Sequence, residues 1–377
     1  MRILHITNDF AGSSVYKNLC KAEDKLNISQ CIYSAIRDPR LIGRNSFTFE
    51  NSVSTIIYSN ILNFFCRINL FYKTKKIYND IIEKVDNLSN IDVVHAHTWY
   101  SDGATAYKLH KKYNIPYIVT IRNTDMNVFF KYLIFLKKFG LEILLCAKKI
   151  IFISEAYKNR FIKEVCNYEN QTQLTSKIEV IPNGVDDFWL NTTFKKKSVI
   201  NNPISLIYIG NFLKGKNIKR LIDAVDLLID AEYNIKFNIV GGGKNSKLEK
   251  YIKSKKYICY HGYVSNKETT TRLLRNSDIF VMPSIHETFG LVYVEALSQG
   301  IPILYTKGEG IDGLYNNSVG EAVDAKNIDC IKSGIQRIID NYSDYNFDPL
   351  KIVENHNWAN IADKYMDIYS HSLLPDK

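Results

Sequence analysis

Two successive series of short β-rich runs, each alternating with helix-like stretches, constrain the fold of this chain most. The first series includes ILHIT, DVVHAH, YIVTI and KIIFIS, and the second, after Asn201, includes SLIYIG, KFNIVGG, DIFVMPS and PILYT. Helical patterns such as IKRLIDAVDLLID lie between these runs. Strands that alternate with helices form βαβ units and doubly wound parallel sheets. We therefore predict an α/β protein with two Rossmann-like lobes.

A polar segment separates the two series. Residues 191–203 hold turn-forming residues and a run of lysines without hydrophobic periodicity, which is typical of a linker. We predict that residues 1–190 form an N-terminal lobe and that residues 200–355 form a C-terminal lobe. Residues 356–377 carry an amphipathic helical pattern, and we expect this helix to return to the N-terminal lobe.

The composition is that of a globular cytosolic protein. The 377 residues are 46% hydrophobic and 23% charged, which excludes a disordered or coiled-coil chain. The seven cysteines show no CxxC spacing, as is typical of reduced thiols in the cytosol. No signal-peptide pattern precedes the first β-rich run, and six charged residues interrupt the longest apolar stretch, residues 128–153. We expect a soluble or peripheral protein.

The segment PSIHETFGLVYVEALSQGIPILYTKGEG, residues 283–310, carries the most chemical information. A buried strand ends at Pro283, a short loop carries Glu287, and a helix begins near Gly290. N–H groups at a helix N-terminus favour a phosphate, and a carboxylate can accept hydrogen bonds from sugar hydroxyls. Glu287 and Glu295, eight residues apart, suit two sets of hydroxyls that flank one diphosphate. The alternative is a plain strand-turn-helix with two solvated glutamates.

This segment resembles the E-x7-E signature of the family 4 glycosyltransferases, which are retaining enzymes of the GT-B fold. IPNGVD, YIGNFLKGKNIKRLIDA and FNIVGGG resemble further motifs of that family, in the family's order. The resemblance covers most of residues 90–310 and is strongest in the C-terminal lobe. It implies two Rossmann-like lobes facing across a cleft, with an acceptor site in the first lobe. It also implies an enzyme of bacterial surface-polysaccharide synthesis that uses a nucleotide-sugar donor.

The resemblance implies a donor site in the C-terminal lobe. Glu287 would hold hydroxyls of the donor sugar, Glu295 would bind the nucleotide ribose, and Lys216 would neutralise the departing diphosphate. The arginine that partners this lysine in the family falls on Asn211. One positive charge is therefore missing from the leaving-group clamp, and Lys214 or another basic residue would compensate, or the donor is held differently. The implied donor site also includes Gly210 and the backbone of Phe289, Gly290 and Leu291, which would cradle the diphosphate.

The N-terminal lobe departs further from the family pattern. The family usually has a glycine-rich loop after its first strand, whereas this chain has DFAGSSVYK, in which Gly12 and Ser13 still permit close approach of an acceptor. A simple turn is the alternative. Where the family has a T-x-H pattern, this chain has Arg122, which cannot act as a base at neutral pH but can bind an anionic or hydroxyl-rich group. Asp125 could then contact an acceptor hydroxyl.

His97, in DVVHAHTW, is another candidate for the same cleft. The alternative is a strand-end histidine whose hydrogen bonds are satisfied by its neighbours. We expect His95 to face the opposite side of the strand, in the core. The predicted catalytic residues are therefore Lys216, Glu287, Arg122 and His97.

The resemblance implies a reaction for which no carboxylate nucleophile is generally accepted. Front-face attack by the acceptor is the favoured picture, with the departing diphosphate helping to deprotonate it, so Lys216 would matter more to the rate than any single general base. No two aspartates are separated by one residue, so the chain lacks the DxD motif with which the other major glycosyltransferase fold holds a divalent metal. We expect no metal and no cofactor, and by frequency in the family a UDP-sugar donor.

Residues 129–163 form a basic stretch with eight basic and two acidic residues. Aromatic and aliphatic side chains accompany the lysines, and this combination suits an anionic membrane surface. A half-buried helix with a solvated lysine face is the alternative. No recognition motif supports nucleic-acid binding.

We therefore expect a retaining, metal-independent glycosyltransferase that works in the cytoplasm, at the inner face of the cytoplasmic membrane. Its partners would be a nucleotide sugar and a lipid-linked or surface-glycan acceptor. Two alternatives remain. One is a nucleotide-sugar epimerase of similar two-lobed architecture, and the other is a catalytically degenerate protein that binds a nucleotide sugar or glycan without turnover.

Overall fold

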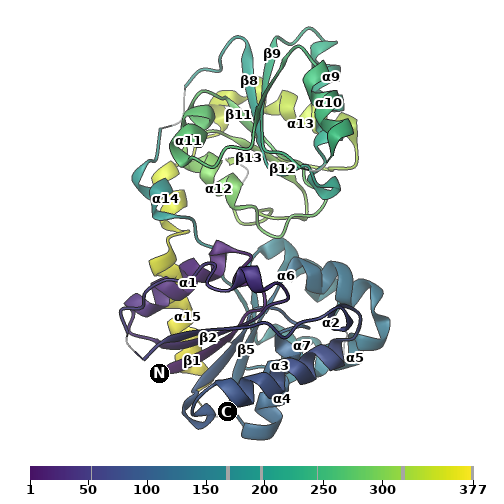
Figure 1. Cartoon of the computed structure of the whole chain (residues 1–377). Helices are drawn as coiled ribbons and strands as arrows, with labels where there is room; N and C mark the ends of the chain where they lie inside the picture. The colour runs from purple at the N-terminus through teal and green to yellow at the C-terminus, as the bar shows by residue number, and fades with distance from the viewer. Residues whose placement is uncertain (52, 167–169, 196–197, 244, 316–318, 375–377) are drawn as a thin grey trace. The chain divides into compact units, whose positions relative to one another are not determined.

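The computed structural model describes residues 1–51, 53–166, 170–195, 198–243, 245–315 and 319–374 (Figure 1). The chain forms two compact units. The first contains Met1–Ile153, Lys158–Gly184 and Trp358–Lys377, and the second contains Ser154–Tyr157 and Val185–Asn357. Each unit is built around one parallel sheet flanked by helices. The chain thus ends in the unit in which it began.

The sheet of the first unit has seven parallel strands in the order β3-β2-β1-β4-β5-β6-β7. The order reverses between β1 and β4, and ligands of open parallel sheets bind beyond the carboxyl ends of the strands at such a point. The strands are β1 (Arg2–Ile6), β2 (Ser29–Ala35), β3 (Thr55–Ser59), β4 (Val93–Ala96), β5 (Tyr117–Ile121), β6 (Lys149–Phe152) and β7 (Ile178–Val180).

Helices cover both faces of this first sheet (Figure 1). On one face α1 packs against α15, and on the other α3, α4 and α5 pack in a row. The helices are α1 (Ser14–Lys25), α2 (Phe65–Ile68), α3 (Leu70–Lys84), α4 (Gly103–Tyr113), α5 (Lys137–Cys146), α6 (Glu155–Glu164), whose first residues belong to the second unit, α7 (Gln171–Thr175) and α15 (Trp358–Ser372). Shorter turns are the 3₁₀-helices η1 (Pro39–Leu41), η2 (Leu88–Asn90) and η4 (Ile134–Leu136), and the π-helix η3 (Asp125–Phe130).

The C-terminal helix α15 completes the core of the first unit. Trp358, Ile361, Tyr365 and Tyr369 recur at helical spacing and are buried in one cluster with apolar residues of α1 and of four strands. A Cβ atom on Gly184 would lie 2.5 Å from Cδ2 of Trp358, so this glycine leaves the space that the indole fills. Burying a large apolar side chain stabilises a fold by about 1.5–3 kcal/mol. The helix is therefore an integral part of this unit.

The sheet of the second unit has six parallel strands in the order β10-β9-β8-β11-β12-β13, which reverses between β8 and β11. Leu206, Phe237 and Phe280 on its central strands are fully buried. The strands are β8 (Ile204–Ile209), β9 (Ile235–Val240), β10 (Ile258–Gly262), β11 (Ile279–Val281), β12 (Ile303–Thr306) and β13 (Gly320–Val323).

The helices of the second unit form two groups, because α9 packs against α13 whereas α12 packs against α8 and α14. They are α8 (Asp187–Asn191), α9 (Ile218–Ile229), α10 (Ser246–Ser254), α11 (Lys267–Arg275), α12 (Leu291–Ser298), α13 (Ile328–Asp340) and α14 (Pro349–Glu354), with the 3₁₀-helices η5 (Lys214–Lys216) and η7 (Tyr342–Asp344).

Both sheets contain the 3-2-1-4-5-6 strand order of the Rossmann fold. The predicted α/β fold with two Rossmann-like parallel sheets is confirmed. Within the described residues, no helix combines the length and the hydrophobicity needed to cross a membrane.

Candidate functional site

Two loops at the carboxyl edge of the second sheet bring opposite charges together. Lys216 lies in η5 after β8, and Glu287 lies in the loop after β11. These strands are neighbours at the point where the strand order reverses, and the Lys216 ammonium forms an ion pair with Oε2 of Glu287. The two side chains keep 22% and 13% of their area exposed. A ligand at this edge can therefore reach both charges.

The backbone of Glu287 is fixed from two sides. Its N–H group donates to Oε2 of Glu309 over 2.9 Å, and its carbonyl oxygen accepts the N–H of Gly310 at 2.6 Å. Two residues before Glu287, the N–H of Ile285 donates to the carbonyl of Gly215 at 2.8 Å. The sequence predicted no role for Glu309. The position of this residue between two glycines after a strand is the one local feature that could have suggested a role.

Asn217 connects the same loops through hydrogen bonds, a role that the sequence did not predict. Its Nδ2 group donates to the carbonyls of Pro283 at 3.0 Å and of Ala325 at 2.6 Å. The residue is buried and has a φ of 58°, in the left-handed region that asparagine tolerates better than most residues. Asn217 therefore sets the position of η5, and with it that of Lys216, relative to the loop after β11.

The N-terminus of α12 is open to an anion. Gly290 precedes the helix with a φ of 81°, and no side chain caps this end. A Cβ atom on Gly290 would lie 2.5 Å from the ring of Tyr293, so both the conformation and the space require glycine. Phe289 is 2% exposed, so the residue as a whole is buried at this end of the helix. The N–H groups of Leu291 and the next residue have no partner within the helix and carry the positive end of its dipole.

Glu295 lies one turn further along α12. Burial raises the pKa of its carboxyl group to about 7, the Lys267 ammonium opposes this shift, and the Asp186 carboxylate adds to it. Lys267 and Asp186 form an ion pair with each other at 2.6 Å. Glu295 is thus a half-buried carboxyl group in which charge is costly, and hydrogen-bond donors from a ligand would offset that cost.

Gly210 and Asn211 lead from β8 into this edge of the sheet. A Cβ atom on Gly241 would lie 1.8 Å from the carbonyl oxygen of Gly210, so the two glycine turns approach each other as closely as backbone allows. Asn211 is exposed, and its backbone carbonyl accepts a hydrogen bond from the Tyr208 hydroxyl at 3.0 Å. Lys214, in the same turn as Lys216, is also exposed.

In the first unit, Gly12 and Ser13 form the turn between β1 and α1. Their N–H groups donate to the carbonyl of Asp9 at 2.9 and 3.1 Å, and Ser13 Oγ accepts the N–H of Val15 as the cap of α1. A Cβ atom on Gly12 would lie 2.1 Å from Oδ1 of Asp9. Burial raises the pKa of Asp9, and the Arg122 guanidinium opposes this shift. Arg122 therefore interacts electrostatically with Asp9 at this edge of the sheet.

Arg122 follows β5 and is half-buried. Its Nε donates to the carbonyl of His97 and its Nη1 to Oδ1 of Asn183, each at 3.4 Å. Its guanidinium carbon lies 5.2 Å from the centroid of the Tyr16 ring. The two long hydrogen bonds to uncharged acceptors and the contact with the Tyr16 ring orient the guanidinium without neutralising it, so that its positive charge can bind a ligand.

Asp125 has a structural role that replaces the expected acceptor contact. Its side chain is 2% exposed and accepts the backbone N–H groups of Trp99 at 3.0 Å, Tyr100 at 3.1 Å and Arg122 at 2.9 Å. Burial raises the pKa of Asp125 to about 6, and these hydrogen bonds oppose the shift. Both oxygens are therefore engaged with the main chain, and this carboxylate holds the loop after β5 against the segment after β4.

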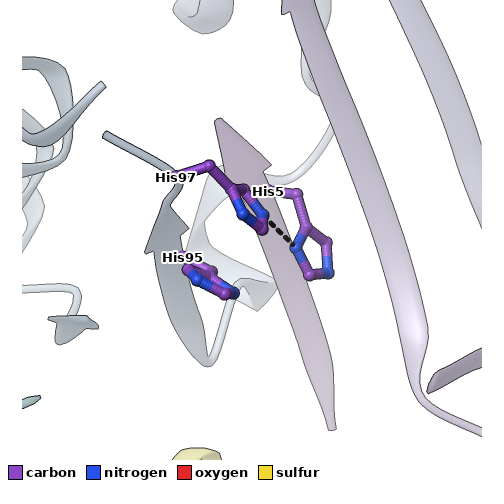
Figure 2. Close-up of side chains that lie close together, drawn as sticks. All are labelled: His5, His95 and His97. Carbon is purple, nitrogen blue, oxygen red and sulfur yellow. Dashed lines mark hydrogen bonds between the residues drawn. The ribbon is translucent and has the colours of Figure 1, made fainter. Parts of the chain in front are cut away.

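His97 and His95 lie side by side in the core, so the expectation that they face opposite sides is wrong (Figure 2). Residues two apart on a strand share a face, and the two rings stack with centroids 3.8 Å apart. His97 Nε2 and His5 Nδ1 are 3.1 Å apart, and no atom of these three side chains reaches solvent. This burial corrects the placement of His97 in a ligand-accessible cleft; its Nε2 has a neighbour as partner, as the alternative expected, whereas its Nδ1 is buried without one.

A buried hydrogen-bond network surrounds these histidines. His95 Nδ1 lies 2.7 Å from the hydroxyl of Tyr369, and His95 Nε2 lies 2.9 Å from the hydroxyl of Thr120. The Tyr369 hydroxyl donates to Glu23 at 2.8 Å, and the other oxygen of Glu23 lies 3.2 Å from His5 Nε2. Burial lowers the pKa of His95 and of His97 well below the usual range. The network therefore joins α1, α15 and three strands through buried imidazoles.

Two groups in the described part of the chain have the spacing to hold a metal ion, namely His5 with His95 and His97, and His5 with Cys20 and Glu23. The ring nitrogens of His5 and His95 already have partners in the network. We therefore interpret both groups as parts of one hydrogen-bonded core.

Two family profiles match this chain, one in each half. Residues 38–187 match the profile described as Glycosyltransferase Family 4, and residues 191–364 match the one described as Glycosyl transferases group 1. The chain is a family 4-like glycosyltransferase of the GT-B fold. As such it is a hexosyltransferase-type enzyme.

Relatives of this glycosyltransferase come from archaea and bacteria. The chain is 26% identical over 307 residues to an uncharacterized glycosyltransferase of Methanocaldococcus jannaschii, a match that covers 75% of this chain and 76% of the relative. It is 27% identical over 213 residues to the capsular polysaccharide biosynthesis glycosyltransferase CapM of Staphylococcus aureus, with 52% and 54% covered. It is 26% identical over 267 residues to the alpha-monoglucosyldiacylglycerol synthase of Acholeplasma laidlawii, with 64% and 65% covered.

Solved structures support the fold of the glycosyltransferase. Sucrose-phosphate synthase from Thermosynechococcus elongatus superposes with a TM-score of 0.73 at 17% identity, over 98% of each chain. At this level of identity the likeness concerns the fold alone.

The candidate residues of the glycosyltransferase fall into two sets. In the second unit, the structure places Lys216, Glu287 and the start of α12 along the carboxyl edge of one sheet. In the first unit, Gly12, Ser13 and Arg122 lie along the carboxyl edge of the other sheet, whereas the side chains of Asp125 and His97 are buried.

Proposed function

We propose that this glycosyltransferase moves a sugar from a nucleotide-sugar donor to a lipid-linked or surface-glycan acceptor, in polysaccharide or glycolipid assembly. The observation that carries the proposal is the convergence of Lys216, Glu287 and the uncapped N-terminus of α12 at the strand-order reversal of the second sheet. The names of two relatives, a capsular polysaccharide enzyme and a monoglucosyldiacylglycerol synthase, support the acceptor class.

The donor diphosphate would lie at the N-terminus of α12. The N–H groups beyond Gly290 would donate to its oxygens, and the Lys216 ammonium would supply a full positive charge as the bond to the sugar breaks. Lys216 now neutralises Glu287, so a bound diphosphate would share this lysine with the carboxylate. Because Asn211 supplies no charge, we propose that the exposed Lys214 provides the second cation.

Glu287 and Glu295 would bind different parts of the donor. The backbone of Glu287 is fixed by Glu309 and Gly310, which suits a carboxylate that must accept hydrogen bonds from sugar hydroxyls in one orientation. Glu295 lies about one turn into α12 and would accept hydrogen bonds from the nucleotide ribose. These roles predict that the two glutamates are not interchangeable.

Retention at the anomeric carbon and independence of metal are part of the proposal. A double displacement would need a carboxylate nucleophile close to the reacting carbon, but Glu287 is paired with Lys216. We propose that the acceptor attacks from the face that the diphosphate leaves. Positioning and leaving-group stabilisation then supply most of the rate.

Peripheral association with the inner face of the cytoplasmic membrane completes the proposal. Within residues 129–163, Tyr132, Ile134 and Phe135 are 64%, 69% and 74% exposed, and Lys131 and Lys138 are exposed beside them. Apolar side chains next to lysines bind the interface of an anionic bilayer. The comparisons do not favour the epimerase or the degenerate binding protein.

A panel of UDP-, GDP-, ADP- and CMP-sugars tests the donor site by thermal shift, each with EDTA and with magnesium. A ligand at a hundredfold excess over its dissociation constant stabilises a protein by about 2.7 kcal/mol. We expect one nucleotide class, UDP by preference, to raise the unfolding temperature equally with and without EDTA. A shift that needs magnesium would overturn metal independence. No shift with any donor, together with no transfer to extracted lipid or glycan acceptors, would overturn the proposed function.

A further inference from the structure

A pocket of about 440 Å³ opens in the first unit and is not part of the site described above. Its walls are Arg37 after β2, the junction of α2 and α3 from Cys66 to Lys73, and four residues within 129–136. These segments follow strands β2, β3 and β5. The pocket therefore lies at the carboxyl edge of the sheet, the edge that also carries Gly12 and Arg122.

Three cations line this pocket, and two of them, Arg37 and Arg67, lack a paired carboxylate among the described residues. Arg37 and Arg67 are exposed, and neither forms an ion pair with any other described residue. The Lys73 ammonium donates to Oγ of Ser101. Burial lowers the pKa of Lys73, the Asp102 carboxylate opposes this shift, and Arg37 adds to it. Mutual repulsion of this kind is relieved when an anion binds between the cations.

Large apolar side chains lie on the segments that form this pocket, and three of them, Ile68, Phe71 and Phe135, line it directly. Each residue of the set named below is more than half exposed, and large exposed apolar side chains that gather near a pocket often mark a binding site. We call this set the apolar rim; it consists of Phe64, Phe65, Ile68, Phe71, Ile134 and Phe135.

We propose that this pocket binds the phosphate-bearing headgroup of a single lipid molecule, with its hydrocarbon chains against the apolar rim. Arginines bind phosphate through paired hydrogen bonds, and a free phosphate would gain nothing from the rim, whereas an uncharged lipid would gain nothing from the arginines. The inference rests on the proposed function, because the bound lipid phosphate would be the carrier end of a lipid-linked acceptor.

Calorimetric titration of the whole chain with monomeric dioctanoyl phosphatidic acid tests the pocket. We expect one binding site, and at least tenfold weaker binding in the variant Arg37→Ala/Arg67→Ala, since each arginine contributes charge-assisted hydrogen bonds. The matched control is Lys21→Ala/Lys112→Ala, which removes two exposed charges from the same unit and should keep the affinity within about twofold, as expected for distant surface charges. Equal affinity of the two double variants would overturn the proposal.

Two partial ligands separate the sources of the affinity. Glycerol 3-phosphate carries only the head and dioctanoylglycerol only the chains, and each should bind at least tenfold more weakly than the complete lipid if both parts contribute. Equal binding of glycerol 3-phosphate would mean a site for soluble phosphates, and equal binding of dioctanoylglycerol would mean a purely apolar groove. Either result overturns the proposal.

A second variant keeps the test decisive if the alanine variant unfolds. Arg37→Lys/Arg67→Lys retains both charges but loses the paired geometry, and we expect an affinity between those of the unchanged protein and the alanine variant. Unchanged affinity in this lysine variant would also count against the proposal. No nucleotide sugar is present in these titrations, so their failure would leave donor binding untouched, and failure of the donor panel would not alter this result.

Discussion

Glu295 gives the sharpest quantitative prediction, because burial raises the pKa of this carboxyl group from 4.5 to about 7. Folding therefore disfavours its ionised form. A difference of about 2.5 between the two pKa values corresponds to at most about 3 kcal/mol. Since the folded pKa is the higher one, this contribution is fully present below about pH 4.5 and is lost as the pH rises through 7.

The substitution Glu295→Gln removes this titration and keeps the shape of the side chain. We expect the free energy of unfolding of the variant, relative to that of the unchanged protein, to rise by about 2–3 kcal/mol between pH 5 and pH 8. Urea unfolding followed by far-UV circular dichroism at each pH measures this difference. A difference that stays constant across the range would refute the perturbed pKa and the reasoning built on it.

The same titration should appear in nucleotide binding. If the ionised carboxylate accepts hydrogen bonds from the ribose, a pKa of about 7 makes the affinity for a nucleoside diphosphate rise about tenfold from pH 6 to pH 8. Glu295→Gln should bind more weakly and lack this component of the pH dependence. Identical pH profiles for the two proteins would show that Glu295 does not contact the nucleotide.

Three further substitutions, each with its own readout, probe loops of the two units. Lys216→Ala should lower kcat by about 10²–10³-fold in an acceptor-transfer assay, which is the usual loss for one preorganised charge at a leaving group. Lys214→Ala should lower kcat less. Equal losses in the two variants would contradict the leading role of Lys216 in stabilising the leaving diphosphate. Gly290→Ala should destabilise the protein by about 1–3 kcal/mol and weaken diphosphate binding, because φ is 81° and the Tyr293 ring fills the space; Gly215→Ala, where a Cβ atom meets nothing within 4 Å, is the control and should be near neutral in thermal unfolding. Asp125→Ala should cost about 3–5 kcal/mol, because it leaves two buried N–H groups and one partly buried N–H group unpaired, yet it should leave nucleotide affinity unchanged. A higher KM for the acceptor without loss of stability would restore the acceptor role.

The two parallel sheets were predictable because their signal is local and repeated. Runs such as SLIYIG and DIFVMPS are buried on both faces, and each is followed by an amphipathic stretch, so the βαβ pattern can be read without knowledge of tertiary contacts. The charges at the edge of the second sheet were predictable for a related reason. Glu287 and the glycine before α12 lie in one continuous segment, and parallel strands place the loops after them on one edge.

The supporting residues were not predictable, because their partners lie far away in sequence. Glu309 acts through the backbone of Glu287, and Asn217 acts through carbonyls 66 and 108 residues away. Asp125 follows the same logic, since only the fold reveals that its oxygens accept main-chain N–H groups from another loop. The pattern TIRNTD gives no indication of this.

The histidines show a different kind of failure. The spacing of two between His95 and His97 does place both on one face, and that much could have been inferred from the strand alone. The expected burial of His95 is confirmed, whereas the burial of His97 could not be inferred, because it belongs to a network closed by Tyr369 of α15, which is 274 residues from His95. A lone histidine at a strand end remains ambiguous until the helix that covers it is known.

Ligand binding by two glutamate variants directly tests the proposal that Glu287 binds the donor sugar and Glu295 binds the nucleotide. Dissociation constants should be measured by calorimetry for Glu287→Ala and Glu295→Ala, each with the free nucleoside diphosphate and with the intact nucleotide sugar. We expect Glu295→Ala to weaken the binding of both ligands, whereas Glu287→Ala should weaken the binding of the nucleotide sugar and leave that of the free diphosphate nearly unchanged. Equal losses on both ligands in both variants would contradict it.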